Sequence, residues 1–176
     1  MVLRIAVTVA ILVALVLIIA ASKPKSFHIQ RFITIDAPPD QVFPLVNDLH
    51  NWPRWGEEDS SVRRTYSGPE NGKGAIAEWK GSGREGEGRM LITESLPTRK
   101  IAIQVDWAKP FVARNINEFV FEHVGNSTRV TWTMKGPNLY VMRLMSIFVN
   151  MDQTMGKHFE TGLVNLKKFA EQEESQ

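Results

Sequence analysis

Side chains that could perform nucleophilic or acid–base chemistry are few in this sequence. The 176 residues include no cysteine, which excludes thiolate nucleophiles, disulfides and cysteine metal sites. The four histidines, His28, His50, His123 and His158, do not stand at the spacing of a known catalytic motif, and no nucleophile elbow is present. Histidines and carboxylates do not cluster at ligand spacing either, so the sequence predicts no metal site.

Two residues remain as weak candidates for a catalytic acid or base. His158 is next to a helical apolar stripe and could point into a cavity, whereas Glu94 shares strand parity with Met90 and Ile92. The plainer alternative is that His158 lies at the surface or at a boundary. The same holds for Glu94 if the end of its strand has already reached solvent.

Polar and aromatic residues on predicted inward faces give a stronger indication of a binding pocket. Asn115 and Asn117 share strand parity with Phe119 and Phe121, and a polar group on a core-facing side needs a partner or a cavity. Tryptophans, five in this chain, suit a small-molecule pocket, although plain packing explains any single one equally well. The predicted ligand-binding residues are Trp55, Trp79, Met90, Ile92, Ile103, Val105, Trp107, Asn117, Phe119, Trp132, Met134, Met151, Met155 and Phe159.

A long amphipathic stretch from Asn138 to Glu173 must position one wall of that pocket. Its apolar residues recur in steps of three and four, which places them on one stripe of a helix. A break is expected near Asn150–Asp152, since Asp152 can cap a new helical start. The stripe is rich in methionine, which is typical of ordinary core or of an adaptable pocket wall. These methionines are Met142, Met145, Met151 and Met155.

Between residues 28 and 135 the sequence predicts strands joined by short turns, with one short helix after the first strand. The helix is expected over Pro39–Leu49, followed by a loop that carries Trp52 and Trp55. The glycine-rich stretch Gly81–Gly88 lacks the lysine of a phosphate loop and is interpreted as a flexible hairpin at the edge of a pocket. The predicted strands are 28–35, 63–67, 75–79, 87–95, 100–107, 113–123 and 128–135. Consecutive hairpins indicate an antiparallel sheet that curves around the long helix.

The N-terminal segment is a candidate membrane anchor. Residues 2–21 are apolar apart from Arg4 and Thr8, and twenty helical residues span about 30 Å. A cleavable signal peptide ending near Ala21 is the alternative. We therefore expect an anchor over 1–22, a linker over 23–26 and a domain over 27–176, in a single-pass membrane protein. Flanking charges do not indicate which side of the membrane the domain occupies.

The charge balance gives no reason to expect a nucleic-acid partner. The formal net charge is +2, and the basic residues do not form a run. The hydrophobic share of 43% and the charged share of 23% are ordinary for a globular chain.

Several stretches resemble the START-like superfamily, the group often labelled SRPBCC or polyketide cyclase/dehydratase. The opening resembles it at Ile33–Phe43, at Asn47-Asp48 and at Trp52–Trp55, and the last two strands do so at Glu118–Glu122 and Thr128–Met134. The resemblance covers about residues 27–171. It implies an α+β helix-grip fold, in which a curved antiparallel sheet holds a long C-terminal helix with an apolar cavity between them.

Members of that superfamily bind lipids, sterols, polyketides and other apolar ligands, and a minority are enzymes. Together with the predicted anchor, the resemblance implies a membrane-anchored domain that binds an apolar small molecule or lipid. No cofactor is expected. A cyclase/dehydratase-like enzyme and a protein-interaction module with a vestigial cavity are the alternatives, because fold does not fix function. No catalytic residue of the superfamily matches a position here.

Overall fold

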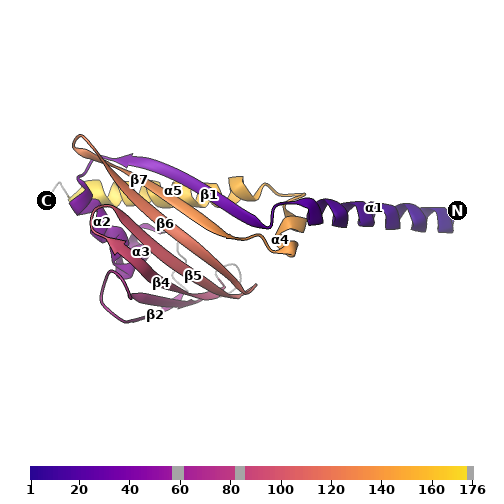
Figure 1. Ribbon diagram of the computed structural model, residues 1–176, viewed down its shortest axis with the longest axis horizontal. Helices are drawn as coiled ribbons and strands as arrows, with labels where there is room; N and C mark the ends of the chain where they lie inside the picture. The colour runs from indigo at the N-terminus through magenta and orange to yellow at the C-terminus, as the bar shows by residue number, and fades with distance from the viewer. Residues whose placement is uncertain (57–61, 82–85, 174–176) are drawn as a thin grey trace.

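The computed structural model describes residues 1–56, 62–81 and 86–173, except for the side chains of Met151 and Glu173. Over these residues, one antiparallel sheet wraps around a long C-terminal helix, and a separate N-terminal helix projects away from them (Figure 1). This arrangement confirms the α+β helix-grip class expected from the sequence.

The described residues form a seven-stranded sheet in the order β1-β7-β6-β5-β4-β3-β2, with every neighbouring pair antiparallel. From β2 to β7, strands that are neighbours in the chain are neighbours in the sheet. The first strand then joins the last one, with Ile29 opposite Met134. The strands are β1 (Ser26–Ile35), β2 (Arg63–Ser67), β3 (Ile76–Lys80), β4 (Glu87–Leu96), β5 (Lys100–Lys109), β6 (Ala113–Val124) and β7 (Ser127–Pro137).

Helix α5 (Met151–Glu173) covers the inner face of the sheet with a buried stripe that includes Phe159, Leu163 and Leu166. The predicted break before it is confirmed. Helix α4 (Tyr140–Met145) precedes it, and the side chain of Asn150 accepts a hydrogen bond from the backbone N–H of Gln153 at 3.1 Å. Asparagine satisfies the first free N–H groups of a helix in this way, so it starts α5 as a new helix.

The prediction of a single apolar stripe over the whole C-terminal region is wrong for its first part. Helix α4 turns away from the sheet and packs against the N-terminal helix, so Met145 is exposed and Phe148 is 76% exposed. The break at Asn150 is the physical reason, because it interrupts the 3.6-residue periodicity that would have kept α4 and α5 in line.

The segment after β1 differs from the prediction in its second half. Helix α2 (Pro39–Asn47) ends two residues early and leads into a 3₁₀ turn, η1 (Leu49–Asn51). The tryptophan loop is one helical turn, α3 (Trp52–Trp55). Its two buried indole N–H groups donate to the carbonyls of Val46 and Leu45, each at 3.0 Å. They therefore satisfy carbonyls that the last turn of α2 leaves open.

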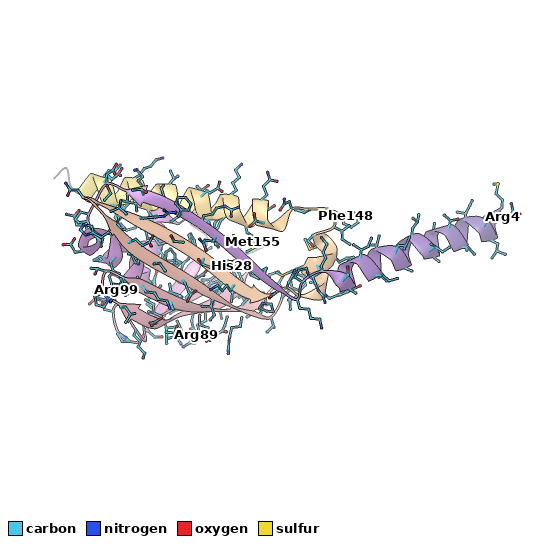
Figure 2. All side chains as sticks on the ribbon, turned by 45° about the horizontal axis from the view of Figure 1, so that its top comes forward. Arg4, His28, Arg89, Arg99, Phe148 and Met155 are labelled. Atoms are coloured by element: carbon cyan, nitrogen blue, oxygen red, sulfur yellow. The ribbon has the colours of Figure 1, made fainter. Side chains whose placement is uncertain are left out.

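The N-terminal helix α1 (Val2–Ser22) is long and apolar enough to cross a membrane, with a mean hydropathy of 3.0 over its most apolar window. No residue of this 18-residue stretch is buried by the rest of the protein. Figure 2 shows Arg4 at the far end of α1, and Phe148 lies close to the end where the chain enters the sheet. The helix is therefore available for a lipid environment along most of its length.

Candidate ligand-binding site

A cavity of about 400 Å³ lies between the inner face of the sheet and the first turns of α5. It is of the size that small-molecule sites in proteins occupy. Ten of the fourteen predicted ligand-binding residues line it, namely Trp55, Trp79, Met90, Val105, Trp107, Asn117, Trp132, Met134, Met155 and Phe159. The shared strand parity and the helical stripe were therefore sufficient to bring most of these side chains together.

Three predicted residues lie in the solid core instead. Ile92, Ile103 and Phe119 are fully buried, and none of them lines the cavity. Phe119 packs edge-on against Trp52, with ring centroids 5.7 Å apart, so that α3 fills the space in front of it. The fourth, Met151, has a side chain outside the described part of the structure. Strand parity identifies the inner face of the sheet. It does not indicate which part of that face is covered by helices and which part faces the cavity.

One wall of the cavity is a stack of aromatic rings that joins the sheet to the helix. The indole of Trp132 on β7 lies flat against the ring of Phe159 on α5, with centroids 4.1 Å apart. On its other side Trp132 stacks against Phe119 at 4.9 Å. Rings that pack against one another in this way present an apolar surface, which suits contact with an apolar ligand.

A second wall is formed by Trp79 and Trp107, which meet at right angles with centroids 5.0 Å apart. Glycine at position 88 makes room for this pair. A Cβ at this position would lie 2.3 Å from the Trp79 ring, so any side chain here would displace the indole. Gly88 thus makes room for the cavity wall, whereas half of the predicted flexible hairpin, residues 82–85, lies outside the described residues.

Two asparagines on β6 hold the indoles of this cavity by hydrogen bonds. The oxygen Oδ1 of Asn117 accepts from Trp132 Nε1 at 3.2 Å. The amide of Asn115 satisfies both of its polar atoms when its oxygen accepts from Trp107 Nε1 at 3.2 Å. Both asparagines are buried, which excludes the alternative that this part of β6 has reached solvent. Buried amides paired with indoles fix the orientation of the rings.

The polar lining on the helix side is His158 together with Thr154, one turn earlier on α5. Both residues are exposed at the rim, and Arg64 of β2 also lines the cavity. Of the two acid–base candidates, His158 is therefore the one that reaches the cavity. The described lining residues include no carboxylate.

The prediction that Glu94 faces inward is wrong. Its side chain is 42% exposed, and its carboxylate pairs with Lys100 Nζ at 2.7 Å. The pairing of β4 with β5 shifts between Ile92 and Glu94, which is a β-bulge. A bulge inserts one residue and reverses the alternation of side chains, so parity counted from Met90 fails beyond it.

The outer face of the sheet carries a chain of ion pairs around Glu118. Lys135 Nζ lies 3.1 Å from one of its oxygens and Lys100 Nζ lies 3.3 Å from the other. The pKa of the Glu118 carboxyl is lowered, first by the hydrogen bond from Lys135 and then by that from Lys100, against partial desolvation. The pKa of Lys100 is raised by its hydrogen bonds to Glu94 and Glu118. These groups stabilise the outer surface and take no part in the cavity.

In the described segments, no group of histidines and carboxylates could hold a metal. Sequence reasoning missed five of the residues that line the cavity. Thr154 stands four residues before His158 on the same helix, and this spacing could have indicated that Thr154 also lines the cavity. For the short edge strand β2, the residue pattern does not indicate which face turns inward. The missed residues are Trp52, Gly56, Val62, Arg64 and Thr154.

Comparison with solved structures supports the fold. Norcoclaurine synthase from Thalictrum flavum, solved as a point mutant with a transition-state analogue, superposes with a TM-score of 0.65 and 8% identity over 85% of this chain and 96% of its own. A protein from Nitrosospira multiformis gives 0.62 and 14% over 85% and 100%. The Aha1 dimer from Colwellia psychrerythraea gives 0.56 and 19% over 80% and 93%.

No curated protein matches the chain in sequence. The family profile described as polyketide cyclase / dehydrase and lipid transport does match, over residues 26–171. The matched segment starts where β1 starts and ends near the end of α5, so it includes the whole sheet and its central helix. The chain therefore belongs to the polyketide cyclase / dehydrase and lipid transport family.

Proposed function

We propose that this protein binds an apolar small molecule or lipid in the cavity between the sheet and α5, while α1 anchors it to a membrane. The observation that carries the proposal is the composition of the cavity. Its walls are mostly tryptophan, phenylalanine, methionine and valine. The polar lining residues are Arg64, Thr154, His158 and Asn117, and Asn117 already accepts a hydrogen bond from an indole. A water-filled cavity of this composition would gain free energy by exchanging water for an apolar ligand.

The family description and the solved structures support the same class of ligand. The family is described by lipid transport as well as by cyclase and dehydrase activity. The norcoclaurine synthase structure holds a transition-state analogue, so a chain of similar fold accommodates an organic molecule. Identity with that enzyme is 8%, so the likeness is one of fold.

The anchor over residues 1–22 and the domain over 27–176 are part of this proposal. Contacts between α1 and the domain favour a retained helix over a cleaved signal peptide. Tyr140 Oη donates to the carbonyl of Leu17 at 3.0 Å, and Arg143 Nη1 donates to that of Ala21 at 3.1 Å. Cleavage after Ala21 would remove both acceptors.

Native mass spectrometry of the full chain, released from detergent micelles, tests the binding proposal. The expected result is a species heavier than the polypeptide by one apolar ligand, which organic solvent extracts. A protein without bound ligand, purified under conditions that neither remove nor replace a ligand, would contradict the proposal and favour an interaction module.

One observation favours the enzymatic alternative, namely that His158 stands at the rim of the cavity. An imidazole at this place could act as a general base if a substrate brings an acidic proton within reach. His158→Gln separates the two functions. A binding protein retains its ligand and shows no change in bound species, whereas an enzyme accumulates the unconverted molecule. We expect the first result, since most of the lining residues are apolar.

A further inference from the structure

Helix α4 is held against the last turns of α1 by a set of hydrogen bonds that we call the clasp, comprising Lys23, Tyr140, Arg143 and Ser146. Besides the bonds from Tyr140 and Arg143, Lys23 Nζ donates to the carbonyl oxygen of Ser146 at 2.8 Å and to its hydroxyl oxygen at 3.0 Å. Ala20 of α1 is fully buried in this contact region. The clasp fixes α4 beside α1 rather than leaving the domain on a loose linker.

The clasp also sets the depth of α4 relative to a bilayer. Tyr140 is level with Leu17, roughly 6 Å along the helix axis from Ala21 at the rise of an α-helix. If the apolar part of α1 crosses the hydrocarbon, α4 must lie at the boundary between hydrocarbon and headgroups. Tyrosine and arginine suit this level, since the ring lies at the interface and the guanidinium reaches the headgroups.

Exposed apolar side chains gather at the same end of the domain. Met145 ends α4, Phe148 and Val149 follow it, and Phe111 and Val112 lie in the β5–β6 hairpin. Ile116 pairs with Lys135, so this hairpin lies at the end of the sheet from which α4 and α1 leave. We call these five residues the apolar rim. Exposed apolar side chains that gather at one end of a domain indicate an interaction surface.

The exposed part of the cavity lining is close to the apolar rim along the chain. Its exposed lining residues, Thr154 and His158, lie in the first two turns of α5, directly after Val149. On the sheet side, Trp107 is two residues from the end of β5 that leads into the rim. A molecule leaving the bilayer at the rim would therefore reach the cavity with little passage through water.

We infer that the apolar rim is a membrane-docking surface, which inserts between lipid headgroups and places the mouth of the cavity against the bilayer. This inference rests on the proposed function in taking α1 as the anchor. The occupant is a lipid surface, because the clasp makes the rim continuous with α1 and because cationic Lys23, Lys25 and Arg143 surround the junction. Phosphate headgroups complement these charges.

Depth-dependent quenching in vesicles tests the inference on the full chain. The native sequence lacks cysteine, so Phe148→Cys or Val112→Cys can carry a single environment-sensitive fluorophore. Val124→Cys is the matched control, since Val124 is apolar, 53% exposed and located in the β6–β7 hairpin at the opposite end of the sheet. The probes are vesicles of phosphatidylcholine with a minor fraction of phosphatidylglycerol, with or without doxyl-labelled lipid.

The inference predicts a blue shift and strong quenching by doxyl lipid at positions 148 and 112, and neither effect at position 124. Equal emission and equal quenching at all three positions would overturn the docking surface, as would a chain that does not enter the vesicles. Occupancy of the cavity is measured separately on the same preparations by native mass spectrometry. Quenching at position 148 with an empty cavity would contradict ligand binding alone. A filled cavity without quenching would contradict docking alone.

A second variant relates docking to transfer. Phe148→Asp combined with Val149→Asp introduces carboxylates that resist entry into hydrocarbon. The expected result is loss of doxyl quenching at position 112 and slower delivery of a fluorescent phospholipid from vesicles to the cavity, with unchanged occupancy at equilibrium. Transfer at the native rate would overturn a role of the rim in loading.

Discussion

The indole of Trp132 stacks on the phenyl ring of Phe159, with ring planes 1° from parallel and centroids 4.1 Å apart. One ring comes from the last strand and the other from the helix that the sheet surrounds, so this contact joins the two layers of the fold. It also forms part of the cavity wall. Stability and the proposed ligand binding therefore depend on the same pair.

Phe159→Ala tests this dependence. We expect the free energy of unfolding to fall by about 3–5 kcal/mol, the usual cost of truncating a buried phenylalanine. Thermal unfolding monitored by tryptophan fluorescence measures the loss. Phe148→Ala is the control for the same chemical change at an exposed site and should change stability by less than about 0.5 kcal/mol. Equal effects of both substitutions would contradict the packing role assigned to Phe159.

The hydrogen bond between Asn117 and Trp132 gives a second prediction. Asn117→Ala leaves the buried indole N–H without its acceptor, which should cost about 1–3 kcal/mol. Trp132→Phe in the same chain removes the indole N–H that has lost its acceptor. The free energy of unfolding of the double variant should therefore fall by less than the sum of the two single changes. A double-mutant cycle from chemical denaturation measures the coupling. Additive losses would mean that the bond does not orient the ring.

Sequence reasoning located most of this site because two periodicities agree on it. Trp107, Phe119 and Trp132 alternate with polar residues on their strands, and Met155 and Phe159 follow the helical spacing. Both patterns identify a face, and antiparallel pairing places those faces together. The depth of burial is not contained in either pattern. Phe119 is therefore solid core, although it has the same parity as the cavity-lining Asn117.

The errors in the prediction arise where a local interaction interrupts a period. A bulge after Ile92 turns Glu94 to the outer face, and the Asn150 cap separates α4 from the stripe. The destination of α4 depends on contacts with Leu17 and Ala21, which are more than one hundred residues away in sequence. Amphipathic spacing alone carries no information about such partners.

Acidification should weaken the domain through Glu118. Its pKa is lowered in the folded state, so the stabilisation is complete above the unfolded-state value and is lost as the pH falls through the lowered folded-state value. Stability should therefore decline as the pH drops below 4.5, the ordinary value for glutamate. Glu118→Gln should reduce the slope of unfolding free energy against pH in this acidic range. An unchanged slope in Glu118→Gln would contradict this role of Glu118.

The side chain of Arg31 lies against α5 at Gly156, which has no Cβ to displace it. This contact gives a further prediction. A Cβ at position 156 would lie 1.9 Å from Arg31 Nη2, whereas the guanidinium now bonds Asp152 at 3.1 Å and Glu160 at 2.7 Å. Gly156→Ala should therefore displace Arg31 and lose these bonds. In an Arg31→Met background the same change should be more favourable, since alanine exceeds glycine in helix propensity by roughly 1 kcal/mol. Equal effects in both backgrounds, measured by thermal unfolding, would contradict the crowding.

Filling the cavity should separate ligand binding from folding. Met155 lines the cavity from α5, partly buried, whereas Val164 on the same helix points outward. Met155→Trp places a larger ring in space that the structure leaves open, so it should displace ligand without the cost of overpacking a filled core. Native mass spectrometry should show a lower fraction of ligand-bound protein for Met155→Trp and an unchanged fraction for Val164→Trp. The unfolding temperature of the ligand-free proteins serves as the control for folding. Full occupancy in the well-folded Met155→Trp variant would mean that the ligand occupies another part of the protein.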